Sequence, residues 1–331
     1  AVCKASILIV RGKDDVVRGF HNVCSHRGNT LVWDRKGTCS GKFVCGFHAW
    51  AYNTKGELTW ISDEENFFDL KKESLGLTAV HTAIWEGFIF INLDPEPQET
   101  LLEYLGGIAP ELGGGYFDRF ALGGTYEVAE HANWKVAFDS QNEVYHVPFQ
   151  HKTTAGDFCV SKGRFNRVMD LRLHHHHSGY SVEHPQGPAV VTPVQSLVFS
   201  LNAEAPQLKL PTTGDFEFYR IFPNLAILIY KGPSQDWYMT FHFWPLAVDR
   251  TKWDIKYYFA PPMHAAQRLE HEYWKCWIRD VLYEDVYVHD MLQKGLESRG
   301  KTEFQLQDEE TQIRHFHKVL EGYMTASQRR A

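Results

Sequence analysis

The chain has 331 residues, of which 44% are hydrophobic and 14% aromatic, and it carries a formal net charge of −7. A single core seldom grows beyond about 250–300 residues, so this length predicts two domains. Dispersed basic residues argue against a nucleic-acid partner, and no apolar run approaches the roughly 20 residues that cross a bilayer. Six cysteines without a signal peptide favour a reducing compartment, with the cytoplasm as the default.

The first part of the chain, to about residue 93, consists of short β-type runs separated by turns such as RGKDD (11–15) and NTKG (53–56). An all-β domain is therefore expected over residues 1–115. The segment DPEPQETLLEYLGG (94–107) and the glycines after it look like a boundary. A second domain is expected over residues 116–331.

The second domain is expected to mix helix with antiparallel sheet. A helical stretch is predicted over residues 129–146, and a long helix is predicted from Met263 to Leu296. Four alternating runs between them predict strands: FEFYRIF (216–222), LAILIYKG (225–232), DWYMTFHFWPL (236–246) and KWDIKYYFA (252–260). The run His174 to His177 is interpreted as a solvent-exposed turn that could bind a metal opportunistically.

Two cysteines and two histidines recur as mixed pairs, Cys24 with His26 and Cys45 with His48. A structural zinc would accept these side chains, although its usual knuckles pair Cys with Cys and His with His. One Cys and one His from each of two loops instead suit a Rieske [2Fe–2S] centre, where one iron takes the thiolates and the other the imidazoles. Glycines between the pairs allow a hairpin that brings the two loops together.

The segments CSHRG (24–28) and CGFHAWAYNTKGEL (45–58) resemble the cluster loops of the Rieske non-haem iron oxygenases, the ring-hydroxylating enzymes of aromatic and steroid catabolism. Such an enzyme needs a second metal where oxygen and substrate meet. On the predicted helix, Asp139, Glu143 and His146 share one face. Pro148 is expected to end this helix, so that His151 folds back towards His146.

Two histidines and one carboxylate form the facial triad of non-haem Fe(II) oxygenases. Spacing alone leaves four acidic candidates for the third ligand: Asp280, Glu284, Asp285 and Asp290. The segment EDVYVHDMLQKGL (284–296) is similar to the family segment whose acidic residue after Glu binds iron, which implies Asp285. The chain departs from many relatives at Asp139 and Ser140, and it has Glu143 where many have Asp.

The resemblance implies an α+β chain, an all-β Rieske domain followed by a helix-grip catalytic domain. It implies one Rieske 2Fe–2S cluster and one mononuclear Fe(II). The expected function is a terminal oxygenase that uses O2 and electrons from a separate reductase or ferredoxin to dihydroxylate, monohydroxylate or demethylate an apolar, aromatic substrate. No Gly-x-Gly-x-x-Gly motif or plant-type ferredoxin spacing supplies an internal reductase.

The resemblance also implies a homotrimer, with or without a small β subunit. In that assembly Glu143 is expected to bridge His146 to the cluster ligand His48 of the next subunit, or else only to orient His146. Two rival functions stay open on the sequence: a Rieske electron-transfer protein, and a helix-grip lipid or steroid carrier. Their iron contents would differ, with about three irons per chain for the oxygenase, two for the electron carrier and none for the lipid carrier.

Overall fold

The computed structural model describes residues 5–155, 160–161, 164–165, 168–182, 192–203, 216–231 and 236–330. The chain forms two compact units, Ala1–Glu103 and Tyr104–Ala331. The division comes before residue 115 because the segment after Glu103 is tied to the second unit: the Tyr104 hydroxyl donates to the Phe222 carbonyl at 2.6 Å, and Glu111 pairs with Arg172.

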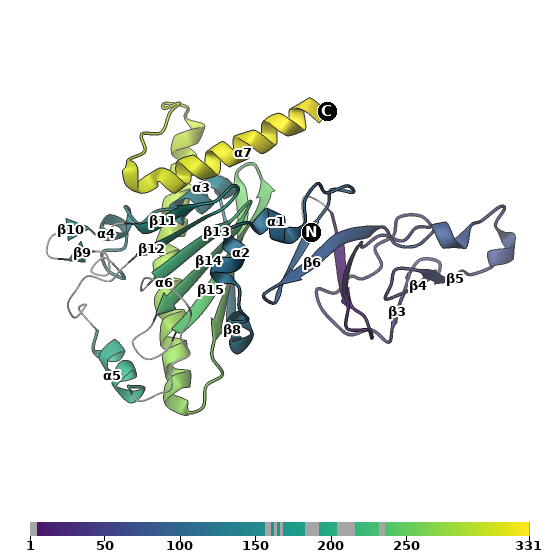
Figure 1. The fold of residues 1–331 in the computed structure, drawn as a ribbon, viewed down its shortest axis with the longest axis horizontal. Helices are drawn as coiled ribbons and strands as arrows, with labels where there is room; N and C mark the ends of the chain where they lie inside the picture. Colours follow the sequence, from purple (N-terminus) through teal and green to yellow (C-terminus); the bar gives the residue numbers. More distant parts are fainter. Residues whose placement is uncertain are drawn as a thin grey trace. The chain divides into compact units, whose positions relative to one another are not determined.

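The first unit is built from two small antiparallel sheets (Figure 1). One has the strand order β1-β2-β6-β7, with β1 Ile7–Arg11, β2 Val17–His21, β6 Ala79–Trp85 and β7 Phe88–Asn92. The other contains β3 Lys42–Val44, β4 Ala51–Asn53 and β5 Leu58–Trp60, and two 3-10 turns follow at Glu64–Asn66 and Lys72–Ser74. The β-rich first domain expected from the sequence is confirmed.

The second unit is a seven-stranded antiparallel sheet in the order β11-β12-β13-β14-β15-β16-β8 (Figure 1). Its strands are β8 Ala121–Glu130, β11 Met169–Leu173, β12 Ser178–Val182, β13 Phe216–Ile221, β14 Leu225–Lys231, β15 Asp236–Ala247 and β16 Arg250–Phe259. A two-stranded ribbon pairs β9 Val160–Ser161 with β10 Arg164–Phe165. The four predicted strands are therefore confirmed as β13 to β16.

The helices of the second unit are α1 Leu101–Leu105, which begins in the last residues of the first unit, α2 Ile108–Leu112, α3 Trp134–Ser140, α4 Val147–Gln150, α5 Pro193–Leu201, α6 Ala265–Glu297 and α7 Thr311–Arg330. Single-turn 3-10 segments lie at Phe117–Arg119 and Asp308–Glu310. The long helix α6 comes shortly after β16 in the chain, where the sequence predicted a long helix (Figure 1). No helix in the described part of the chain is long and apolar enough to span a membrane.

The buried face of α6 explains how the helix meets the sheet. Trp274, Ile278, Leu282, Asp285 and His289 are buried at intervals of three or four positions, which is the spacing of one helix face. The first three pack in the core with the aromatic side chains of the sheet. Asp285 therefore occupies a position at which the helix pattern would place an apolar side chain.

The helix predicted over residues 129–146 is wrong in its extent. Strand β8 continues to Glu130, and α3 ends at Ser140, after which turns lead to His146. Asp139, Glu143 and His146 therefore do not share one helix face, and the Asp139 carboxylate pairs instead with His317 of α7 at 2.7 Å. Pro148 does not end a helix but lies in the first turn of α4, where its missing N–H costs nothing.

The run His174 to His177 forms the turn between β11 and β12, as expected, but it is not uniformly exposed. His177 is only 1% exposed: the Phe222 backbone N–H donates to Nδ1 at 3.0 Å, and Nε2 lies 2.8 Å from the Tyr104 carbonyl. Burial lowers the pKa of His177 to about 4. This histidine is therefore a neutral structural link between the turn and its neighbours.

Candidate metal centres

The two cluster loops of the first unit face each other as the sequence predicted. Cys24 and Cys45 are buried in one apolar core, and the rings of His26 and His48 lie edge to face with centroids 4.6 Å apart. The Nδ1 atoms of both histidines are buried and have no hydrogen-bond partner in the described structure. Two unpartnered ring nitrogens beside two buried sulfurs fit a cluster with mixed Cys and His ligands.

Hydrogen-bond donors surround the cysteine sulfurs. The Cys24 Sγ lies 3.3 Å from the Tyr52 hydroxyl, and the Asn29 side-chain amide donates to the Cys45 Sγ at 3.6 Å. Burial raises the pKa of Cys24. Burial also acts to raise that of Cys45, but backbone N–H groups after Cys45 and the Asn29 amide outweigh it and lower the pKa of this thiol. Such donors stabilise negative charge on sulfur, which a cluster with thiolate ligands requires.

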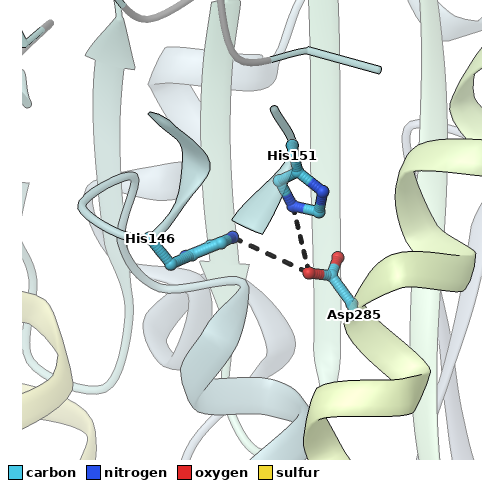
Figure 2. Close-up of side chains that lie close together, drawn as sticks. All are labelled: His146, His151 and Asp285. Atoms are coloured by element: carbon cyan, nitrogen blue, oxygen red, sulfur yellow. Dashed lines mark ion pairs between the residues drawn. The ribbon is translucent and has the colours of Figure 1, made fainter. Parts of the chain in front are cut away.

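The second constellation is in the second unit, where His146, His151 and Asp285 converge (Figure 2). One ligand atom from each lies within 4.8 Å of the others. His151 Nε2 is 3.1 Å and His146 Nε2 is 3.7 Å from the same oxygen, Oδ1 of Asp285. Two imidazoles and one carboxylate on one side of a shared point are the donor set of a mononuclear non-haem iron.

A carboxylate supports each of the two histidines from behind. Glu143 bonds to His146 Nδ1 and also accepts from the His146 backbone N–H, while Glu284 Oε2 lies 2.7 Å from His151 Nδ1. Burial acts to lower the pKa of His146, but the hydrogen bond that its ring donates to Glu143 and the charges of Glu143 and Asp285 raise it. These contacts direct both Nε2 atoms towards Asp285, as outer carboxylates do in metal sites.

Asp285 is held in place by two amides. Gln150 Nε2 donates to Oδ1 at 2.6 Å and Gln141 Nε2 donates to Oδ2 at 3.1 Å. Burial acts to raise the pKa of Asp285, but the His151 hydrogen bond and the neighbouring histidines outweigh it and keep the pKa low. Sequence reasoning missed both glutamines, although Gln150 directly precedes a predicted ligand.

The three rival acidic residues are placed elsewhere by α6. Asp280 is on the exposed side, where it pairs with Arg279 at 2.7 Å. Asp290 accepts from the His131 backbone N–H at 3.0 Å. Glu284 lies behind His151, where it also accepts from the hydroxyls of two threonines. Of the four candidates, only Asp285 meets both histidines.

A cavity of about 100 Å³ opens onto this site. That volume is far above the roughly 10–15 Å³ that holds one water, so the cavity can take a small organic molecule. Its polar edge is formed by the metal-site residues and their neighbours Ser140 and Gln141. The remainder is apolar, with aromatic side chains on several elements: Phe216, Phe218, Phe241 and Trp277.

An all-β cluster domain joined to a sheet-and-helix domain with a 2-His-1-carboxylate site defines a Rieske-type oxygenase. The family model for the Rieske [2Fe-2S] domain matches residues 1–75, and the model for the ring hydroxylating alpha subunit (catalytic domain) matches residues 117–326. The chain therefore belongs to the ring-hydroxylating alpha subunit family.

Similar proteins are found among enzymes that act on quaternary ammonium compounds. The carnitine monooxygenase oxygenase subunit of Acinetobacter baumannii is 25% identical, with coverage of 89% of this chain and 73% of that protein. The chloroplastic choline monooxygenase of Amaranthus tricolor is 30% identical, with coverage of 94% and 65%. The chain thus spans just under two thirds of the choline enzyme's length.

Solved structures share the fold. The quaternary ammonium Rieske monooxygenase CntA in complex with an inhibitor has a TM-score of 0.78 at 22% identity and covers 98% of this chain and 83% of its own. Naphthalene 1,2-dioxygenase from Rhodococcus sp., bound to indole, has a TM-score of 0.73 at 18% identity, with coverage of 96% and 83%. The mixed α+β architecture expected from the sequence is therefore confirmed.

Proposed function

We propose that this chain is the terminal oxygenase of a Rieske system that monooxygenates a small quaternary ammonium compound. The observation that carries the proposal is the convergence of His146, His151 and Asp285 at the edge of an aromatic-lined cavity. Relatives named as carnitine and choline monooxygenases support the reaction type and the substrate class.

In this proposal Cys24, His26, Cys45 and His48 hold the Rieske cluster, and His146, His151 and Asp285 hold the mononuclear iron. When bound, the cluster supplies electrons one at a time and the iron supplies the position for oxygen activation. Glu143 and Glu284 keep the two imidazoles oriented. The apolar wall excludes water and places the substrate beside the metal site.

The aromatic rings suit a cationic head group. Phe216, Phe218, Phe241 and Trp277 line the cavity, and a trimethylammonium group binds favourably to aromatic faces. Glu143 adds a carboxylate to the same wall. The quaternary ammonium group of such a substrate would thus be bound by ring faces rather than by hydrogen bonds, which this group cannot donate.

An uncharged aromatic substrate is the second candidate, because the lining away from the metal-site residues is almost wholly apolar. At similar volume, the two candidates differ in whether the substrate carries a cationic head group or an uncharged ring. A comparison of choline or γ-butyrobetaine with an uncharged aromatic of similar volume therefore decides between them.

The electron supply and the assembly are parts of the same proposal. Relatives named as oxygenase subunits support a separate reductase or ferredoxin. We retain the homotrimer as a prediction, with Glu143 as the bridge between His146 and His48 of the next subunit. Both Glu143 oxygens contact His146, so the orienting role has direct contacts and the bridging role rests on the predicted assembly.

The test begins with protein purified anaerobically. About three irons per chain, together with a Rieske visible spectrum, would support the oxygenase over the electron carrier and the lipid carrier. Single-turnover reactions with the reduced protein would then follow substrate-dependent incorporation of heavy oxygen by mass spectrometry. Iron binding at the expected level without oxygenation of any quaternary ammonium compound would overturn the substrate class but not the enzyme class.

A further inference from the structure

Arg220 is a buried cation behind the wall of the cavity. It lies on β13 and is only 3% exposed. Because side chains alternate along a strand, Arg220 faces the same side of the sheet as Phe216 and Phe218, which both line the cavity. Its guanidinium lies 5.2 Å from the Phe218 ring centroid and 5.6 Å from that of Tyr180.

The contacts of Arg220 in the described structure contain no carboxylate. It donates to the Tyr180 hydroxyl at 3.4 Å and to the Tyr219 carbonyl at 3.2 Å, while Nε is buried without a partner. Arg172, on β11, which β12 separates from β13, pairs instead with Glu111 and Glu217 at 3.0 and 2.9 Å. Burial lowers the pKa of Arg220, as expected where no anion compensates the charge.

An arginine remains charged in proteins, so Arg220 is a buried positive charge with no carboxylate among its described contacts. Burying an unpaired charge is costly, and two ring faces and two neutral acceptors compensate only part of that cost. Phe218 lies against the guanidinium and also lines the cavity. A ligand anion in the cavity would feel this charge through a dry wall, where ionic screening is weak.

We propose that Arg220 makes the cavity select substrates that carry a carboxylate over purely cationic ones. This inference rests on the proposed function and narrows its substrate class to zwitterions of the γ-butyrobetaine type, in preference to choline. The relatives include both kinds, since one set is named for carnitine and the other for choline. The guanidinium attracts the carboxylate of the ligand electrostatically across Phe218 and does not form a hydrogen bond with the ligand.

The test compares ligands that differ only in their carboxylate. Calorimetric titration of the anaerobic holoenzyme would use γ-butyrobetaine and its methyl ester. It would also use the tert-butyl analogue of γ-butyrobetaine, in which carbon replaces the ammonium nitrogen, and the methyl ester of that analogue. In each pair we expect the acid to bind at least about tenfold more tightly than the ester, a difference of about 1.4 kcal/mol.

Three substitutions, two at Arg220 and a control at Arg250, locate the effect. Arg220→Met removes the charge and should abolish the acid-over-ester preference, whereas Arg220→Lys should retain part of it. Arg250→Met removes an exposed cation of the same unit and should leave the preference unchanged. Thermal melts check that each variant folds, and Arg220→Lys, in which a partial loss of the preference is expected, keeps the test usable where Arg220→Met does not fold.

Equal affinity for acid and ester in the wild-type protein, or an undiminished preference in Arg220→Met, would overturn the inference. The tert-butyl pair separates this result from a failure of the proposed function. If neither ammonium ligand binds but the tert-butyl acid is preferred over its ester, and Arg220→Met loses that preference, the role of Arg220 stands and the quaternary ammonium class falls.

Discussion

Removing single charges from α6 tests the iron site most directly, because three acidic residues in one stretch of this helix have different surroundings. Asp285 meets both histidines, Glu284 supports His151 from behind, and Asp280 pairs with Arg279 at the surface. Asp285→Asn, Glu284→Gln and Asp280→Asn change the charge with little change of shape. Their effects on iron affinity should therefore follow their distance from the metal.

Asp285→Asn removes the only anion of the proposed ligand set, and we expect iron affinity to fall by more than about 100-fold. Glu284→Gln keeps a hydrogen-bond acceptor for His151 Nδ1 but loses its charge. Loss of such an outer partner typically costs 10–100-fold, or roughly 1.4–2.7 kcal/mol. Asp280→Asn should change nothing measurable, since exposed ion pairs contribute little.

The assay is iron titration of the apoprotein, with the Rieske visible spectrum as an internal control. That spectrum should persist in all three variants because the cluster ligands belong to the other unit. Normal iron affinity in Asp285→Asn, or a loss of iron in Asp280→Asn as large as in Glu284→Gln, would refute the ligand assignment. Thermal melts separate metal loss from unfolding, since Asp285 also accepts from two glutamine amides.

Three further outcomes are expected. Tyr52→Phe should lower the cluster reduction potential by roughly 40 mV in a redox titration, since a hydroxyl bond of about 1 kcal/mol to Cys24 would be lost; an unchanged potential would contradict this contact. Because the pKa of His177 falls from 6.5 to about 4 on folding, its contribution to stability is complete above pH 6.5 and is lost as the pH falls towards 4. His177→Gln should remove up to roughly 3 kcal/mol of that acid dependence in unfolding measurements, and an equally steep profile would disprove the assignment. Ala49 has a φ of 58° in the second cluster loop, so Ala49→Gly should raise the melting temperature by relieving a cost of about 1 kcal/mol.

The metal chemistry of this protein could be predicted from the sequence because the ligands other than Asp285 lie in pairs that are close together along the chain. The paired Cys and His residues of the cluster lie two and three positions apart, and His146 and His151 are separated by five positions. Short spacings limit the possible geometries, and ligand type then selects the metal. The strands β13 to β16 were equally legible, since their alternation or continuous apolar character reports burial directly.

The helix before His146 was misjudged because local pattern does not fix where a helix ends. Residues 129–146 contain no glycine or internal proline to mark a boundary, yet Glu130 and its predecessors pair with β16 as an edge strand. Asp139 is hydrogen-bonded to His317 of α7, and the sequence did not predict this contact. Both contacts join segments far apart in the chain.

Spacing left four acidic candidates on α6, and only the tertiary structure shows that Asp285, which the family resemblance implied, faces the histidines and shows which residues hold it. Asp285 follows Trp274, Ile278 and Leu282 on the buried face of α6. What this face contacts is determined by the sheet and by the loop after α3, which pack against it. The same holds for Arg220. The sequence has acidic residues both before and after Arg220, and it does not indicate that none of them pairs with this arginine. Burial and the absence of a counter-charge in the described contacts are properties of packing, which the sequence specifies but does not display.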